Sequence, residues 1–259
     1  MSKPFRSGPL DMGDARIHYG LADALEDEFV EAAVPVAGSP RAVYSDDPVS
    51  QRVYLIAHGF ITSANDAARF HRYALDTIGL WPVASWSSMR PALESSIKAY
   101  WLLSPEDEVE RQRRALRMTY DTIQQGERLE DVSPARTRPK EFVEKEREKL
   151  RAWAGERDLS NRKLKELPPM DSTKNEDMMD ALPEDLRQRA RWWWRLLSGI
   201  DHGDLMSAQV VTKSLKTVRV PGGVEMVLEP RDDRFRELVE RTTELRMLAM
   251  QRFLHLTNG

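Results

Sequence analysis

In the stretch RPALESSIKAYWLL, residues 90–103, the apolar residues recur at the spacing of an amphipathic α-helix. At ~100° per residue, Leu93, Ile97 and Trp101 fall within one wide apolar face. The opposite side carries only alanine and serine. That side is either solvated or small enough for another helix to approach closely. The pattern therefore predicts a helix with at least one packed face.

Arg90 stands inside this apolar face, where a charge is costly unless it is paired. Glu94 follows one turn later and is the expected partner. Arg113, in a later helical segment, is a second candidate partner for Glu94, unless it extends its guanidinium to solvent. The Arg90–Glu94 pair either fixes the helix register alone or supports a polar site. Pro91 indicates that the helix begins or kinks at this pair.

Four further segments have helical periodicity: residues 50–76, 104–129, 184–211 and 231–256. Ser104 is the expected N-cap of the second, with Pro105 in its first turn. Two β-favouring runs flank a Pro-Gly-Gly turn. The sequence therefore predicts a mainly α fold, an antiparallel helical bundle with one small β-hairpin near residues 215–228.

The composition changes along the chain indicate its domain organisation. Residues 1–49 contain two Gly- and Pro-bearing stretches without periodicity, so we expect an N-terminal arm with one short helix, at residues 21–33. Residues 50–259 then form a single bundle domain. At about residues 130–183 the chain is rich in Lys, Glu, Arg and Asp. This composition predicts an insertion or mobile arm that contains one surface helix, at residues 139–156.

Bulk composition excludes several classes of protein. The 259 residues carry a net charge of -3, so no overall positive field gathers nucleic acid, and any such site must be local. Cysteine is absent, which rules out disulfides and thiolate chemistry. No apolar run is long enough to span a bilayer, and the N-terminus does not resemble a signal peptide. We expect a cytoplasmic protein without membrane association.

The segment RVYLIAHGFITSA, residues 52–64, resembles the strand and oxyanion loop of an α/β-hydrolase. That fold also needs a Gly-x-Ser-x-Gly turn that exposes the nucleophilic serine, and the chain contains none. We therefore interpret His58 as a histidine of a helix or loop.

The stretch WWWRLLSGIDHGD, residues 192–204, raises the question of function. On a helix, Arg191, Arg195, Ser198 and His202 fall within an arc of about 60°. The apolar arc opposite is expected to hold Trp192, Trp193, Leu196, Leu197 and Ile200. The polar stripe is either a solvated face or a chemical site. Glycines after Ser198 and His202 favour close backbone approach or helix termination.

Two motifs together resemble bacterial helical proteins of the HEPN type. They are Arg90-x-x-x-Glu94, which leads into Tyr-Trp-Leu-Leu, and Arg195-x-x-Ser198-x-x-x-His202-Gly. The family signature places four to six residues between an arginine and a histidine, and Arg195 and His202 have six between them. The resemblance implies an antiparallel helical bundle, a homodimer, and metal-independent endoribonuclease activity of a toxin–antitoxin or phage-defence system.

The resemblance also implies roles for the stripe. His202 would be the general acid or base toward RNA, and Arg195 would bind the phosphate. Ser198 would assist by hydrogen bonding, with Arg90, Glu94, Arg113 and Arg191 in support. RNA and a protein antitoxin are the implied partners, and a cleft shared between two subunits would complete the site.

A second interpretation is a non-catalytic helical protein-interaction module. Leu196 follows Arg195 directly, where active members of the family usually carry a polar residue, so the active site would be lost. In neither case do we expect a metal or cofactor. The five histidines are scattered, and the Pro-Gly-Gly turn precedes a strand, which does not suit a phosphate-binding loop.

Overall fold

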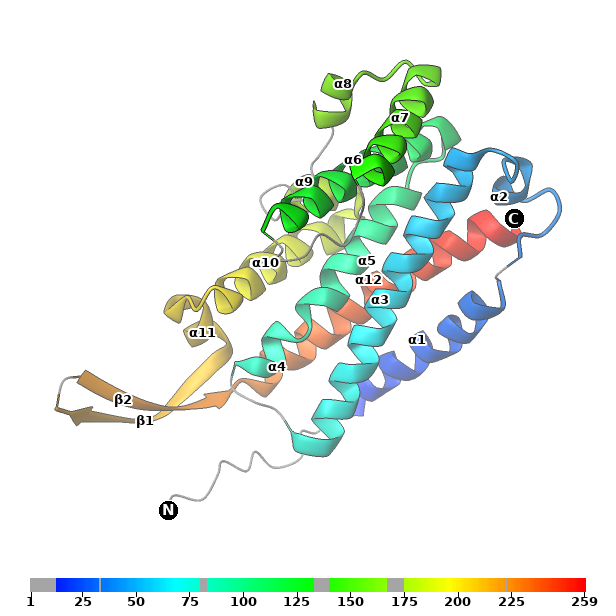
Figure 1. Ribbon diagram of the computed structural model, residues 1–259. Coiled ribbons are helices and arrows are strands. Elements are labelled where there is room, and N and C mark those ends of the chain that lie inside the picture. The colour runs from blue at the N-terminus through cyan, green and yellow to red at the C-terminus, as the bar shows by residue number, and fades with distance from the viewer. Residues whose placement is uncertain (1–12, 33, 80–82, 133–139, 167–174, 222) are drawn as a thin grey trace.

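The computed structural model describes residues 13–32, 34–79, 83–132, 140–166, 175–221 and 223–259. In these ranges the regular structure is helical apart from one two-stranded antiparallel sheet. The predicted mainly α fold with a small hairpin is confirmed, and Figure 1 shows its long helices packed into a bundle. In chain order the elements are α1 (Gly13–Glu31), α2 (Pro40–Val43), α3 (Pro48–Ile78), α4 (Ala84–Ser87), α5 (Arg90–Leu103), α6 (Glu108–Val132), α7 (Lys140–Glu156), α8 (Asn161–Glu166), α9 (Asn175–Met178), η1 (Met179–Ala181), α10 (Glu184–Asp201), α11 (Leu205–Val211), β1 (Thr212–Val220), β2 (Gly223–Pro230) and α12 (Asp232–Asn258).

Helix α5 lies within the bundle, in contact with α3, α6, α10 and α12 (Figure 1). It begins at Arg90 with Pro91 in its first turn, so the proline marks a helix start. The side that carries only small residues is buried through Ala92, Ser96 and Ala99. Of the two explanations for that side, close helix contact is therefore correct. Ser96 donates its hydroxyl to the carbonyl of Ala92 at 2.7 Å, which satisfies the buried polar group.

Helix α3 runs antiparallel to α12. Near the end of α3 the His71 ring lies 5.3 Å from that of Phe235, and near its beginning the Tyr54 ring lies 6.2 Å from that of Phe253. Helix α1 runs parallel to α12, since Phe29 also meets Phe253, with ring centroids 5.0 Å apart. The long helices thus pack in both directions, as an antiparallel bundle requires.

A buried charge joins these three helices. Arg246 of α12 is only 2% exposed, and it donates to Oδ1 of Asn65 on α3 from two nitrogens, at 3.1 and 3.0 Å. Glu26 of α1 lies 3.7 Å from the same guanidinium. These contacts offset the cost of burying Arg246, so the network specifies how α1, α3 and α12 align.

The predicted N-cap at Ser104 is wrong. Ser104 follows the last residue of α5, and its hydroxyl donates to the carbonyl of Trp101 at 3.1 Å. Helix α6 begins at Glu108, where the Asp107 carboxylate accepts a hydrogen bond from the backbone N–H of Val109 at 3.1 Å. Ser104 does not cap α6, because its hydroxyl is bonded to the preceding helix α5. Asp107 directly precedes the first residue of α6 and caps it instead.

The N-terminal region is more helical than predicted. Helix α1 begins at Gly13, eight residues before the expected start at Leu21. The packing of Tyr19 and Ala22 in the core stabilises this additional helical part. Residues 1–12 of the predicted arm lie outside the described residues.

Helix α3 continues through Gly59, so His58 is helical and a hydrolase strand is absent there. No described helix combines the length and apolarity that crossing a bilayer requires.

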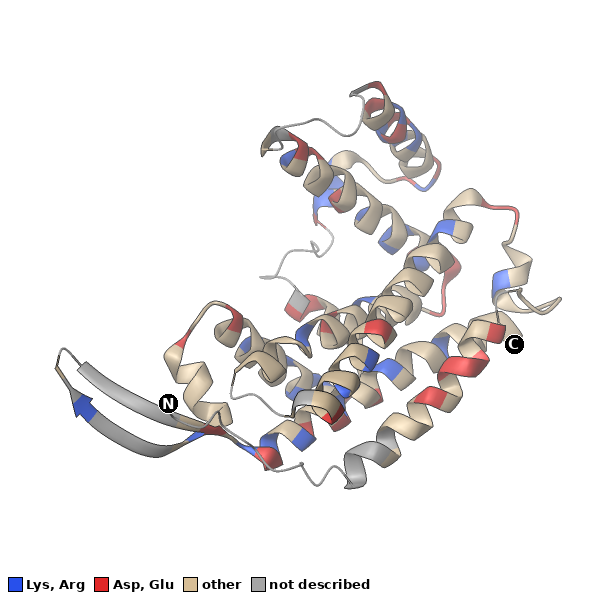
Figure 2. Cartoon of the chain, turned by 60° about the horizontal axis from the view of Figure 1, so that its bottom comes forward, with Lys and Arg blue, Asp and Glu red and all other residues tan. Residues whose placement is uncertain are grey.

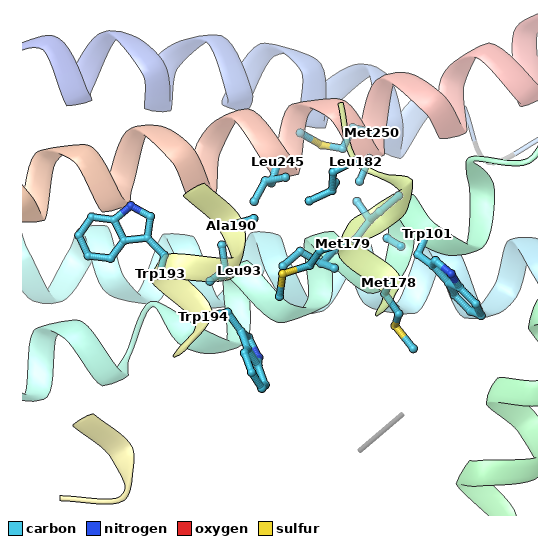
Figure 3. Close-up of a cluster of buried hydrophobic side chains, with 14 of the residues drawn as sticks. Leu93, Trp101, Met178, Met179, Leu182, Ala190, Trp193, Trp194, Leu245 and Met250 are labelled. Atoms are coloured by element: carbon cyan, nitrogen blue, oxygen red, sulfur yellow. The ribbon is translucent and has the colours of Figure 1, made fainter. Parts of the chain in front are cut away.

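The charged segment at 130–183 contains the predicted surface helix, observed as α7. Helix α7 returns along α6, and Leu150 and Ala154 form a small core with Leu116 and with Leu164 of α8. Further along, Met178, Met179 and Leu182 enter the main core (Figure 3). Residues 133–139 and 167–174 lie outside the described part. The described part of the segment is therefore packed against the bundle.

The hairpin pairs Thr212 with Pro230 at its base and Val220 with Gly223 at its tip. The register shifts between Ser214 and Lys216, which indicates a β-bulge. The observed hairpin begins three residues before the predicted range 215–228 and ends two residues after it.

An aromatic cluster closes one end of the bundle. Trp86 of α4 stacks on Trp193 of α10 with ring centroids 6.1 Å apart, and it meets Phe235 of α12 edge-on at 5.1 Å. Trp86 and Trp193 are fully buried. Because His71 contacts the same Phe235, the cluster connects α3, α4, α10 and α12.

We expect adjacent tryptophans to differ strongly in their contribution to stability. Trp193→Ala should lower the free energy of unfolding by roughly 3–5 kcal/mol, because it opens a cavity in the cluster. Trp192 is 40% exposed. Trp192→Ala should therefore cost only about 1 kcal/mol, from its edge contact with Trp193. Urea denaturation of both variants measures the difference, and equal losses would contradict the assigned packing.

The buried His71 predicts a specific pH dependence of stability. Burial lowers the pKa of His71 to about 4, although a hydrogen bond to the Ser85 carbonyl partly opposes the shift. The neutral ring is therefore favoured in the folded state. Its contribution is complete above an unfolded pKa of about 6.5 and is lost as the pH falls toward 4.

Between pH 7 and pH 4, the wild type should lose about 3 kcal/mol more stability than His71→Gln, which lacks the titrating ring. Denaturant melts of both proteins across this range cancel the carboxylate titrations that they share. Parallel pH profiles for the two proteins would exclude this role for His71.

Candidate functional site

Helix α10 presents the predicted stripe on its outer side. Its buried side holds the residues Ala190, Trp193, Trp194, Leu196, Leu197 and Ile200. The assignment of Trp192 to the apolar side was wrong: its ring is 40% exposed, with the Arg234 guanidinium 5.7 Å from its centroid. Trp194 is buried instead, because the contact with α5 extends the buried arc beyond the one predicted from periodicity. Trp193 and Trp194 consequently point in different directions (Figure 3).

The two glycines near the end of α10 have different roles. A Cβ at Gly199 would lie only 2.1 Å from Oγ of Ser207, so α11 approaches the backbone of α10 closely. Gly203 has a φ of +75° and follows the C-cap residue His202. Gly203 therefore ends the helix, since a left-handed conformation disfavours residues with a side chain.

The predicted site residues are accessible to different degrees. His202 is exposed at the C-cap of α10, and Ser198, one turn earlier, is partly buried. The Arg195 side chain is 67% exposed, and that of Arg191 is 34% exposed. Helical geometry thus places all four on the outer side of α10, as predicted.

Both arginines of the stripe are engaged by the preceding segment. Arg195 donates from Nε and Nη2 to the two oxygens of Glu176, at 2.8 and 2.7 Å. Arg191 donates to Asp180 at 2.5 Å. The hydrogen bond from Arg195 lowers the pKa of Glu176, so this carboxylate is ionised near neutral pH. The α9–η1 segment therefore supplies carboxylates where a phosphate would bind Arg195.

Arg90 and Glu94 connect α5 to α10. Arg90 Nε donates to Glu94 Oε1 at 2.8 Å, which confirms the predicted pair. Its Nη1 donates to Asp201 Oδ2 at 2.7 Å, and the Trp194 indole donates to Glu94 Oε1 at 2.9 Å. Lys98 lies 3.8 Å from the other Glu94 oxygen. We call these five residues the α5–α10 polar network, and it adjoins the stripe because Asp201 directly precedes His202.

The charges of this network depend on one another. Burial alone would lower the pKa of Arg90, but its hydrogen bonds to Asp201 and Glu94 raise it overall. Burial lowers the pKa of Lys98, and Glu94 partly opposes that shift. Because Arg90 is 16% exposed and Glu94 20%, the pair retains more strength than a fully solvated pair.

The proposed partnership of Arg113 with Glu94 is wrong. Arg113 lies 3.7 Å from Glu110 on its own helix, and its side chain is 38% exposed. It therefore follows the alternative, in which the guanidinium reaches the solvent. Trp194 and Asp201 instead supply the contacts to α5.

The sequence analysis did not predict three residues that contact the stripe or the α5–α10 polar network: Trp194, Asp201 and Glu176. Trp194 and Asp201 are seven residues apart and so share one side of α10, a spacing that marks a helix-facing pair. For Glu176 no local signal exists, because it reaches Arg195 through tertiary packing. The described side chains include no group of three or more His, Asp or Glu suited to hold a metal ion. Ser198 lies between Trp194 and Asp201 on the helix, which places it beside the α5–α10 polar network.

Comparisons of the chain with protein-family models, curated proteins and solved structures found no match.

We expect the two carboxylates beside the stripe to differ in their effect on stability. Glu94→Gln should lower the free energy of unfolding by about 1–3 kcal/mol, because it removes the charge that balances Arg90 and Lys98. Glu176→Gln should change stability little, since its partner Arg195 is exposed. Thermal and urea melts of the two matched variants provide the comparison. A larger loss for Glu176→Gln would show that the α9–η1 contact has the greater structural role.

Proposed function

We propose that the chain is a HEPN-like RNA-binding protein that cleaves RNA without a metal ion. The observation that carries this proposal is the exposed end of α10, where His202 stands at the C-cap and Arg195 and Ser198 lie on the same outer side. Basic and acidic residues are interspersed along the helices (Figure 2), so RNA would be held locally at this stripe.

In the proposed reaction, the 2′-oxygen of the RNA attacks the adjacent phosphorus. A P–O2′ bond forms and the P–O5′ bond breaks, which leaves a cyclic phosphate and a free 5′-hydroxyl. His202 either takes the proton of the attacking 2′-hydroxyl or gives a proton to the leaving 5′-oxygen, and water carries the other proton. Arg195 binds the phosphate and stabilises its developing charge, and Ser198 donates a hydrogen bond to it.

The α5–α10 polar network would position His202. Arg90 binds the side chain of Asp201, the residue before His202, and Glu94 holds Arg90 in place. One exposed stripe leaves a substrate open to water, so we propose a homodimer in which two stripes form a shared cleft. Such a nuclease would act in a toxin–antitoxin or phage-defence system, with a protein antitoxin in the former case.

A second candidate function is a non-catalytic interaction module. The bidentate contact between Arg195 and Glu176 favours it, because the guanidinium that would bind phosphate is already neutralised. In this case the outer side of α10 contacts a protein partner, and the α5–α10 polar network has a structural role alone.

Cleavage of cellular RNA in EDTA tests the nuclease. The wild type should cut, and His202→Ala and Arg195→Ala should reduce the rate by at least about 100-fold, because each removes a group that acts in the transition state. His255→Ala is the matched control, since His255 is exposed on another helix. Melting temperatures of all variants should match that of the wild type.

Two outcomes would reject the nuclease: intact RNA after incubation with the folded wild type, or unchanged cleavage by His202→Ala. Glu176→Gln separates the two candidates. It should strengthen RNA binding several-fold if Arg195 contacts phosphate, because the competing carboxylate is gone. Unchanged RNA binding by this variant would favour the interaction module.

A further inference from the structure

We propose that a pocket between α2 and the first half of α3 binds a small organic carboxylate with an aromatic or branched apolar body. The pocket has a volume of about 540 Å³, which falls in the range of small-molecule sites. Its lining consists of Pro35, Arg41, Tyr44, Ser45, Gln51, Tyr54, Leu55 and His58. None of these belongs to the stripe on α10, so the proposal does not depend on the proposed nuclease.

Arg41 supplies the positive charge of the pocket. Its guanidinium lies 5.3 Å from the ring centroids of both Tyr54 and Phe253, and it donates to the Ala32 carbonyl at 3.3 Å. These contacts hold the guanidinium in one place. Among the eight lining residues, no side chain is acidic. Burial lowers the pKa of Arg41, so an anion in the pocket would recover electrostatic free energy that burial removes.

Tyr54 contributes a wall of the pocket. Its hydroxyl is buried and has no hydrogen-bond partner among the described residues. Burial raises the pKa of Tyr54 to about 12, so the hydroxyl keeps its proton near neutral pH. Because this hydroxyl is closed to solvent, a ligand in the pocket would meet the ring of Tyr54 and not its hydroxyl.

His58 contributes a neutral polar edge. Burial lowers the pKa of its imidazole, and Arg41 lowers it further, so the ring is uncharged near neutral pH. The ring stacks on Phe29 with centroids 4.9 Å apart, which fixes its plane. The lining therefore offers one full positive charge, which suits a monoanion better than a doubly charged phosphate.

The remaining walls require an apolar body on the ligand. Leu55 is 72% exposed and Tyr44 is 43% exposed, although both line the pocket. A bound ring or branched chain would cover them and remove apolar surface from water. The combination of an apolar wall and one guanidinium is the chemistry that recognises an apolar monocarboxylate.

Isothermal titration of the full chain with naphthalene-2-carboxylate and with neutral naphthalene-2-carboxamide tests this site. The carboxylate should bind at least about tenfold more tightly, because only it forms a charge-assisted hydrogen bond with Arg41. Arg41→Gln should remove that preference.

A second pair of variants keeps the test decisive if Arg41→Gln fails to fold. Leu55→Glu places a negative charge at the exposed rim and should weaken the carboxylate several-fold more than Leu55→Gln does. Equal affinity for the two probes, no binding of either to the wild type at millimolar concentration, or identical affinities of the two Leu55 variants would overturn the proposal. If peptides displaced the probe and small carboxylates did not, the occupant would be a protein and the proposal would be overturned.

Discussion

The burial of α5 on nearly every side is the constraint on which the other features depend. Ala92, Ser96 and Ala99 allow close approach of neighbouring helices, and Leu93 and Ile97 fill the opposite face. The charged side chains of this helix are only partly exposed, at 16% for Arg90 and 20% for Glu94. The two ionised groups at its start must therefore be paired, and α10 supplies the remaining partners through Asp201 and Trp194. The packing of α10 follows from this requirement.

Helix α10 consequently carries two sets of polar contacts. Trp194 and Asp201 face α5, where limited exposure strengthens their interactions. Arg191 and Arg195 face the α9–η1 segment, where the pairs are solvated and can be exchanged at small cost. His202 stands at the end of the helix, next to both. The contacts with α5 therefore form a support, whereas an RNA or a protein could displace the carboxylates that contact Arg191 and Arg195. Both candidate functions depend on this difference.

The second proposed site draws on a different property of the same bundle. Helices α1, α3 and α12 meet around Phe29, Tyr54 and Phe253, and Arg41 lies over the rings of Tyr54 and Phe253. Of these three aromatic residues, Tyr54 also lines the pocket. A ligand at this position would touch no residue of the α10 stripe.

The helical class, the hairpin and the Arg90–Glu94 pair could be predicted from the sequence, because each depends on residues close in the chain. Pro91 limited the same position to a helix start or a kink, and the structure shows a start. The sequence also placed Arg195, Ser198 and His202 on one side of a helix, which periodicity dictates. The residues that complete the pairs became clear from the packing of the helices. Asp201 replaced Arg113 beside the α5 pair, Glu176 engaged Arg195, and Asp107 replaced Ser104 as a cap. Such choices depend on contacts between distant segments, where burial and competing hydrogen bonds outweigh local preference.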